Sequence, residues 1–120
     1  MTSIARLERE WHGDVPVARL HGEIDGSNVG WISERLHALL TNRSVLMVID
    51  LSETTYLDSA GINLLFALAE QMRTRQQQLA IVVSAGAPIA RMVALTGLDQ
   101  LVPMHATLPD ALAGAGSEGS

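Results

Sequence analysis

Apolar and polar positions change from strand-like to helix-like spacing over the first third of the chain. Residues 4–11 and 15–21 show partial apolar alternation, and the Gly-Asp pair between them suits a hairpin turn, so we expect two antiparallel strands. From Asn28 to Leu40 the apolar residues recur at helical spacing, after a polar segment over 25–28 that offers cap residues. The pattern predicts a hairpin followed by a helix.

The middle of the chain alternates apolar runs with amphipathic ones. Val45 to Ile49 and Leu79 to Val83 are almost wholly apolar, which is typical of strands covered on both faces. The segments from about Ser59 to Arg75 and from Pro88 to Thr96 are predicted to be helices, and a glycine follows the second. We expect only a short polar loop between the first apolar strand and the helix that starts at Ser59.

The C-terminal part carries weaker signals. Leu101 to Met104 is short and apolar with a proline inside, which favours a weak edge strand. Thr107 and Asp110 have the spacing of a capping box, so a short last helix is expected to follow. Residues 114–120 have nothing to bury and are predicted to form a flexible tail, which leaves one domain over residues 1–113.

Strands that alternate with helices after an opening hairpin predict an α/β fold. We expect a mixed, largely parallel central sheet of about five strands with about four helices, and an antiparallel hairpin at the N-terminus. Sites in such sheets form at the carboxyl ends of strands. Asp25 follows one strand, Asp50 ends another and Ser59 begins a helix, so we expect these three on one rim that forms the functional surface.

Composition narrows the classes of function. The 120 residues with 48% hydrophobic content suit one compact core, and eight basic against thirteen acidic residues disfavour direct binding of nucleic acid. Every basic residue is arginine and cysteine is absent, which excludes lysine-dependent phosphate loops, Schiff bases and thiol chemistry. The N-terminus lacks the order of a signal peptide, and Ile62 to Ala69 is far shorter than the ~20 residues of a membrane span. We therefore expect a soluble, cytoplasmic protein.

The segment Asp58-Ser59-Ala60-Gly61 places a serine hydroxyl at a predicted helix start. A small polar residue there most often caps the helix by accepting a hydrogen bond from a free backbone amide. If Asp58 is the cap instead, the Ser59 hydroxyl is free and suits phosphorylation, because the positive end of the helix dipole tolerates about −1.5 to −2 added charges. The same charge would alter the electrostatics of any partner docked on a rim that already carries aspartates.

Other chemistry finds less support. Asp25, Asp50 and Asp58 resemble the magnesium ligands of phospho-accepting receiver domains, but that chemistry also uses a lysine, and caps or loop contacts are the simpler role. No Gly-x-Ser-x-Gly elbow surrounds Ser59, and the four histidines are scattered along the chain at His12, His21, His37 and His105. We expect no catalytic residue, no metal and no cofactor, and hence no enzyme.

The helix that starts at Ser59 has apolar residues on two sides. One stripe faces a core and a second covers much of the remaining circumference, with Ala60, Leu64, Ala67 and Leu68. A helix that packs on one side does not need the second stripe. Either a neighbouring element covers this stripe, or the stripe binds a partner or a second copy of the chain beside Ser59.

With these residues laid out, the chain resembles the STAS domain, the sulfate transporter and anti-sigma factor antagonist family. The resemblance covers roughly residues 5–113. The segments that carry it are Leu20-His21-Gly22-Glu23-Ile24-Asp25, Val48-Ile49-Asp50-Leu51-Ser52, Tyr56-Leu57-Asp58-Ser59-Ala60-Gly61, and the closing strand and helix around Thr107.

The resemblance implies a non-enzymatic bacterial switch. The unphosphorylated domain would bind an anti-sigma factor that is itself a serine kinase, and this binding would free a sigma factor. Phosphorylation of Ser59 would end the binding, ATP would belong to the kinase, and a phosphoserine phosphatase would reverse the modification. The residues expected to contact the kinase are Asp25, Gly26, Ser27, Asn28, Asp58, Ala60, Gly61, Leu64 and Leu68.

Two alternatives stay open at this point. Thr54 and Thr55 add hydroxyls near Ser59 and are rival phosphorylation sites. The family also contains regulatory subunits of ABC lipid transporters and parts of stress-signalling assemblies. In the transport role, Leu64 and Leu68 would hold the chain against an ATPase.

Overall fold

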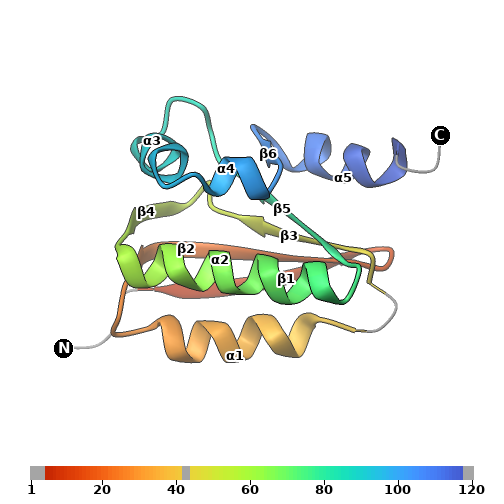
Figure 1. Ribbon diagram of the computed structural model, residues 1–120, viewed down its shortest axis with the longest axis horizontal. Coiled ribbons are helices and arrows are strands. Elements are labelled where there is room, and N and C mark those ends of the chain that lie inside the picture. The colour runs from red at the N-terminus through yellow and green to blue at the C-terminus, as the bar shows by residue number, and fades with distance from the viewer. Residues whose placement is uncertain (1–4, 42–43, 118–120) are drawn as a thin grey trace.

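The computed structural model describes residues 5–41 and 44–117, and in these residues one mixed sheet is covered by helices on both faces (Figure 1). The strands are β1 (Arg6–His12), β2 (Val15–Ile24), β3 (Leu46–Asp50), β4 (Thr54–Leu57), β5 (Gln78–Val82) and β6 (Met104–His105). The helices are α1 (Val29–Leu39), α2 (Ser59–Thr74), α3 (Pro88–Leu95), α4 (Leu98–Leu101) and α5 (Leu108–Ser117).

The strand order confirms the predicted fold class. The sheet runs β1-β2-β3-β5-β6, with β4 paired to β2 outside this path. Strands β1 and β2 form the expected antiparallel hairpin, whose turn holds Gly13 at a φ of 63°. All the other pairings are parallel. Helical crossovers join these parallel strands, as an α/β chain requires.

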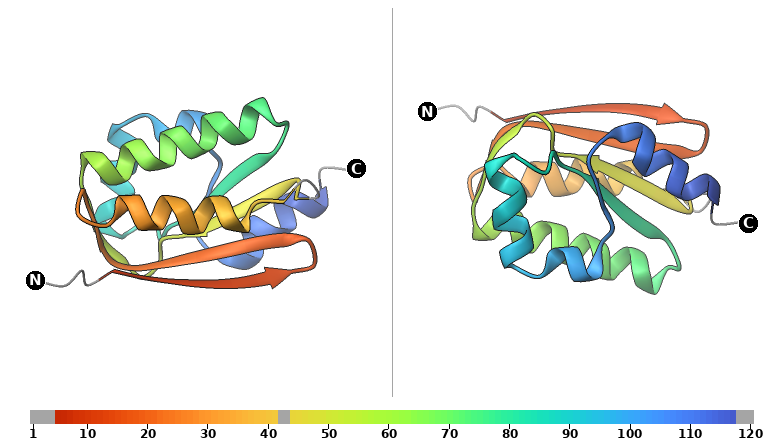
Figure 2. Two further views of the ribbon diagram at one scale, coloured as in Figure 1. Left: turned by 90° about the horizontal axis from the view of Figure 1, so that it is seen from below. Right: turned by 90° about the horizontal axis from the view of Figure 1, so that it is seen from above.

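Alternate residues of the central strands enter two separate cores. Ala18, Ile49 and Ile81 face a large apolar cluster shared with α1, α2, α3 and α4. Their neighbours Val48 and Val82 face the smaller cluster under α5. Figure 2 shows α1 and α2 on one face of the sheet and α5 on the other. Both faces of β3 and β5 are therefore buried, which explains their nearly unbroken apolar sequences.

Strand β4 was not predicted from the sequence, and it shapes the functional end of the molecule. Strand β3 pairs with β2 over Val17–Arg19, whereas β4 pairs with β2 over Gly22–Ile24, further along the same strand. The chain thus continues past the end of β3 and returns to the edge of β2. The signal was weak because β4 has only four residues, of which the middle two are exposed.

Three further details differ from the sequence-based expectations. The strand expected from Val45 begins one residue later, at Leu46, and Val45 itself is 67% exposed instead of covered. The expected edge strand is present as β6, but its bounds were wrong: Gly97, at a φ of 84°, opens the short helix α4 over Leu98–Leu101, and of the residues 101–105 only Met104 and His105 pair with β5. Helix α5 extends to Ser117, into the segment expected to be a flexible tail. Residues 118–120 of that tail lie outside the described residues.

Candidate functional site

The start of α2 leaves the Ser59 hydroxyl free. Asp58 is the N-cap, and its Oδ1 accepts a hydrogen bond of 3.0 Å from the backbone amide of Gly61. Ser59 is exposed, and its hydroxyl makes no hydrogen bond to any residue in the described ranges 5–41 and 44–117. Asp58, and not Ser59, therefore caps α2, so the Ser59 hydroxyl is not used by the helix and is available for modification.

Asp58 also connects α2 to the loop that follows β2. Its Oδ2 accepts a hydrogen bond of 3.3 Å from the amide of Gly26, and its own amide donates to the Ile24 carbonyl over 3.2 Å. These contacts place the loop of residues 25–28 beside Ser59. Asp25, Asp58 and Ser59 therefore lie on one rim of the sheet, as predicted.

The loop over residues 25–28 is held by its own side chains. Asp25 Oδ1 accepts from the Ser27 hydroxyl at 2.5 Å and from the Ser27 amide at 2.9 Å. These two bonds lower the pKa of the Asp25 carboxyl below its usual range. Asn28 is buried. Its Oδ1 accepts a hydrogen bond from the Asp25 amide and its Nδ2 donates to the Glu23 carbonyl, so this side chain fixes the loop to the end of β2. Gly26 and Ser27 are exposed to a partner, whereas Asn28 is not.

Helix α2 offers a partner less surface than its sequence indicated. Leu68 is 1% exposed and lies in the main core, so its expected role in partner binding is wrong. Ala60 and Leu64 are half-buried, and Leu64 packs against that core. Gly61 is buried as well. A Cβ added at this position would lie 3.0 Å from Leu57 Cδ2 and 3.2 Å from the Ile24 carbonyl oxygen, so a larger residue would not fit without a shift. Gly61 thus permits close packing of α2 on β2 and β4.

The two rival hydroxyls differ in accessibility. Thr54 is buried, and its Oγ1 donates a hydrogen bond of 2.7 Å to the Leu20 carbonyl. Phosphorylation of Thr54 would break this buried bond and place a charge inside the sheet. Thr55 is exposed on β4. Of the two threonines, only Thr55 remains accessible to a kinase.

Asp50 does not lie on the rim, contrary to expectation. It is 3% exposed, and its Oδ2 accepts a hydrogen bond of 3.0 Å from Arg19 Nε. Arg19 pairs with Asp50 across β2 and β3, five residues before Ile24, which is about 16 Å along the strand. This bond to Asp50 raises the pKa of the Arg19 guanidinium. Exposed carboxylates of Glu8 and Glu10 complete a charged network on this face of the sheet.

No group of three or more potential metal ligands gathers anywhere in residues 5–41 and 44–117. Asp25, Asp50 and Asp58 thus do not converge into the magnesium site considered from the sequence. Within the same described part of the chain, every helix is too short or too polar to cross a bilayer.

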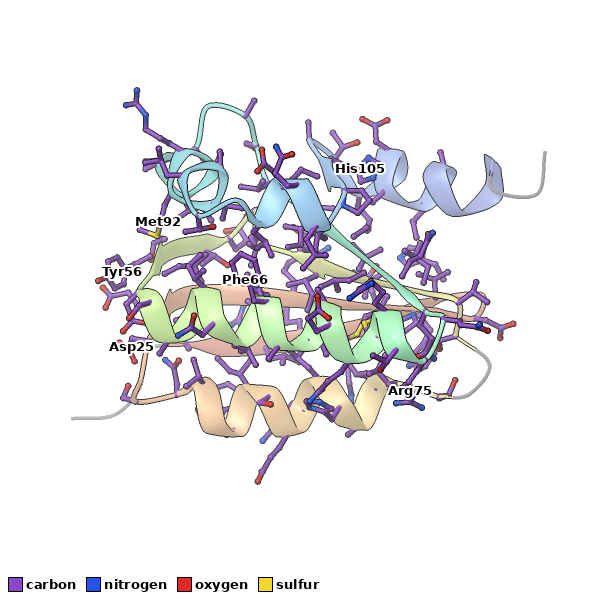
Figure 3. All side chains as sticks on the ribbon, viewed as in Figure 1. Asp25, Tyr56, Phe66, Arg75, Met92 and His105 are labelled. Atoms are coloured by element: carbon purple, nitrogen blue, oxygen red, sulfur yellow. The ribbon has the colours of Figure 1, made fainter. Side chains whose placement is uncertain are left out.

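An open groove of about 680 Å³ borders Ser59. Its lining comes from β4, the first half of α2 and the C-terminal part of α3, and consists of Tyr56, Leu57, Asp58, Ser59, Ile62, Asn63, Phe66, Met92 and Thr96. Figure 3 shows Tyr56 and Met92 near each other at the end of the molecule that also holds Asp25. None of these lining residues is a histidine that could activate Ser59 as a nucleophile. Sequence reasoning missed this groove because α3 lies some thirty residues beyond Ser59 in the chain.

The chain belongs to the STAS domain family, whose model matches residues 6–111. It is 33% identical over 103 residues to the anti-sigma-F factor antagonist RsfB of Mycobacterium tuberculosis, covering 86% of this chain and 83% of that protein. The crystal structure of an anti-sigma factor antagonist from Mycobacterium paratuberculosis superposes with a TM-score of 0.82 at 31% identity, over 92% of each chain. The anti-sigma factor antagonist SpoIIAA in its unphosphorylated form shares the fold, with a TM-score of 0.76 at 18% identity over 93% and 97% of the two chains.

Proposed function

We propose that this protein is a cytoplasmic anti-sigma factor antagonist that binds an anti-sigma factor with serine-kinase activity and is released when Ser59 is phosphorylated. The observation that carries the proposal is the free, exposed Ser59 hydroxyl beside a helix cap supplied by Asp58. The names of relatives at 33% and 31% identity support the same role. The protein acts as a substrate and a binding module in this role, not as an enzyme.

The phosphorylation step needs only the Ser59 hydroxyl from this chain. The Ser59 oxygen forms a bond to the γ-phosphorus of ATP, the bond from that phosphorus to the β,γ-bridging oxygen breaks, and ADP leaves. The hydroxyl proton passes to a base on the kinase. The new phosphate lies at the N-terminus of α2, where the helix dipole stabilises it, so the domain keeps its fold. A phosphoserine phosphatase restores the hydroxyl.

The docking surface in this proposal consists of the exposed positions around Ser59. Asp25, Gly26, Ser27 and Asp58 are at least partly accessible there. The buried positions Asn28, Gly61 and Leu68 instead hold that surface in shape. With Leu68 in the core, the apolar stripe that favoured a transporter subunit loses one of its two leucines.

The test uses purified serine-kinase anti-sigma factors from the same organism, each incubated with the chain and ATP. We expect peptide mass spectrometry to find one phosphate on Ser59, the Thr55→Ala variant to be modified like wild type, and Ser59→Ala to remain unmodified. Calorimetric titration should show binding of the unmodified chain to the same kinase, at least roughly 30-fold weaker after phosphorylation. Modification confined to Thr55, or equal binding before and after phosphorylation, would overturn the proposal.

A further inference from the structure

The groove beside Ser59 has the chemistry of a site for an apolar side chain. Tyr56, Phe66 and Met92 supply aromatic and thioether surface from three different elements. Tyr56 is 46% exposed, which is high for an aromatic residue on a strand, and Phe66 and Met92 are half-buried. Methionine adapts its shape to a bound group at little cost. An incoming apolar side chain would remove this surface from water.

The groove has little to offer a charged ligand. Asp58 is its single charged lining residue, and both carboxylate oxygens of Asp58 already accept hydrogen bonds from Gly61 and Gly26. The remaining polar groups are the uncharged side chains of Tyr56, Asn63 and Thr96, together with Ser59 itself. Thr96 Oγ1 donates to the Val93 carbonyl and is therefore occupied as well. A neutral, mainly apolar occupant matches this lining best.

The position of Ser59 in the wall of the groove indicates who supplies the occupant. Phosphoryl transfer requires the γ-phosphate to approach the Ser59 oxygen in line at about 3–3.5 Å. A kinase surface that reaches Ser59 at the N-terminus of α2 must therefore cover the adjoining groove. This continuity favours the kinase over a second copy of the chain or a free small molecule.

We infer that the groove between β4, α2 and α3 is a docking pocket for one apolar side chain of the kinase, and that α3 is part of the recognition surface through Met92. This inference rests on the proposed function. It extends the docking surface beyond the segments around Asp25 and Ser59. A phosphate on Ser59 would then lie beside the pocket. Its bound water would have to be removed before an apolar side chain could enter, so phosphorylation would weaken binding there.

The test compares two positions on α3 that differ in access to the pocket. Met92 lines the pocket, whereas Leu95, one turn further along the same helix, is 81% exposed and lies outside the lining. We expect Met92→Glu to weaken binding of the unphosphorylated chain to the kinase that modifies Ser59 by at least roughly tenfold. The matched control Leu95→Glu adds the same charge and should stay within about twofold of wild type.

Two truncations separate the pocket from any loss of folding. Met92→Ala and Tyr56→Ala each truncate one lining side chain, from α3 and from β4, without adding charge, and each should weaken binding roughly fivefold. Both should raise the KM for Ser59 phosphorylation and leave kcat unchanged, because the pocket binds the kinase and takes no part in phosphoryl transfer. Thermal denaturation of each variant shows whether the fold is kept, and a merely structural defect would not produce this split between KM and kcat.

The outcomes distinguish the inference from the proposed function. If the wild-type chain is neither bound nor phosphorylated by the serine kinases tested, the proposed function fails. If the wild type is bound and phosphorylated, but folded Met92→Ala and Tyr56→Ala variants bind the kinase like wild type, only the pocket is overturned. A change confined to self-association, measured by light scattering, would assign the groove to a second copy of the chain and equally overturn the inference.

Discussion

Asp50 and Asp58 both follow buried strand residues, yet they have opposite roles. Asp50 is buried, and its carboxylate accepts hydrogen bonds from Arg19 Nε at 3.0 Å and from the Ser52 amide at 2.9 Å. Asp58 is half-exposed, and its carboxylate accepts hydrogen bonds from the backbone amides of Gly61 and Gly26. The Asp50 region has a side-chain cation that neutralises the carboxylate, whereas the Ser59 end relies on backbone dipoles. If Ser59 is phosphorylated as proposed, the backbone dipoles at this helix start can stabilise the added charge without a side-chain cation.

The two regions also differ in how much freedom they leave to a partner. In the network around Arg19, the carboxylates of Asp50, Glu8 and Glu10 each lie within 4 Å of the Arg19 guanidinium, so opposite charges already face one another there. At the Ser59 end, an unbonded hydroxyl, the exposed loop residues Gly26 and Ser27, and an apolar groove lie side by side. Under the proposed function, the first region stabilises the fold and the second is the surface that the partner recognises.

The largest effect that separates the regions is expected from Asp50→Ala. Loss of this carboxylate leaves the Arg19 guanidinium without its closest partner, and we expect a loss of about 2 kcal/mol in the free energy of unfolding. Binding to the kinase by the remaining folded protein should be unchanged. Urea denaturation and calorimetric titration measure the two quantities. The control Glu10→Gln removes an exposed carboxylate 3.7 Å from the same arginine and should cost at most about 0.5 kcal/mol.

Asp58→Ala tests the opposite region and should affect both quantities. Removal of the N-cap costs about 1 kcal/mol of stability and frees the Gly26 amide. Hydrogen exchange should accelerate at the amides of Gly61 and Gly26, and binding of the kinase should weaken because the loop moves relative to Ser59. Asp58→Asn keeps a good capping residue and should retain most of the stability. Unchanged exchange at both amides in Asp58→Ala would show that the two segments are not joined through Asp58.

The smallest effect is expected at Asp25, where hydrogen bonds from Ser27 lower the pKa of the carboxyl. A folded-state pKa below the unfolded value means that Asp25 contributes stability above the unfolded pKa, and that this contribution is lost as the pH falls through the folded value. Ser27→Ala removes the hydroxyl and should raise the pKa of Asp25 towards its usual range. Carboxyl 13C shifts recorded against pH measure this change, and an unaltered pKa in Ser27→Ala would contradict the assigned cause.

Much of the fold was predictable because burial leaves a direct pattern in the sequence. The apolar runs that became β3 and β5 are covered on both faces, and the helical spacing after Asn28 and from Ser59 onwards matches α1 and α2. The strand that sequence reasoning missed is short. The four residues of β4 are too few for a periodic signal, and this strand depends on pairing with β2. The edge strand β6 was expected, but its two residues are defined by pairing with β5, so its bounds were misplaced.

The site was predictable only in part, because exposure depends on neighbours far along the chain. The order Asp58-Ser59-Ala60-Gly61 indicated a helix start, and it left two residues competing for the cap. Leu68 looked available on a helical wheel but is covered by the core. Asp50 looked like a rim residue until its partner Arg19, thirty-one positions earlier, was placed beside it.

The sequence by itself determined an α/β domain of the STAS type, a serine at the start of α2, and the absence of lysine and cysteine chemistry. These features depend on residue identity and local spacing. Only the tertiary structure decided that Asp58 caps α2 and leaves Ser59 free, that β4 carries α2 to the side of Asp25, and that Tyr56, Phe66 and Met92 meet in one groove. The physical reason is that hydrogen-bond partners and burial are set by the packing of segments distant in the chain, which local patterns do not encode.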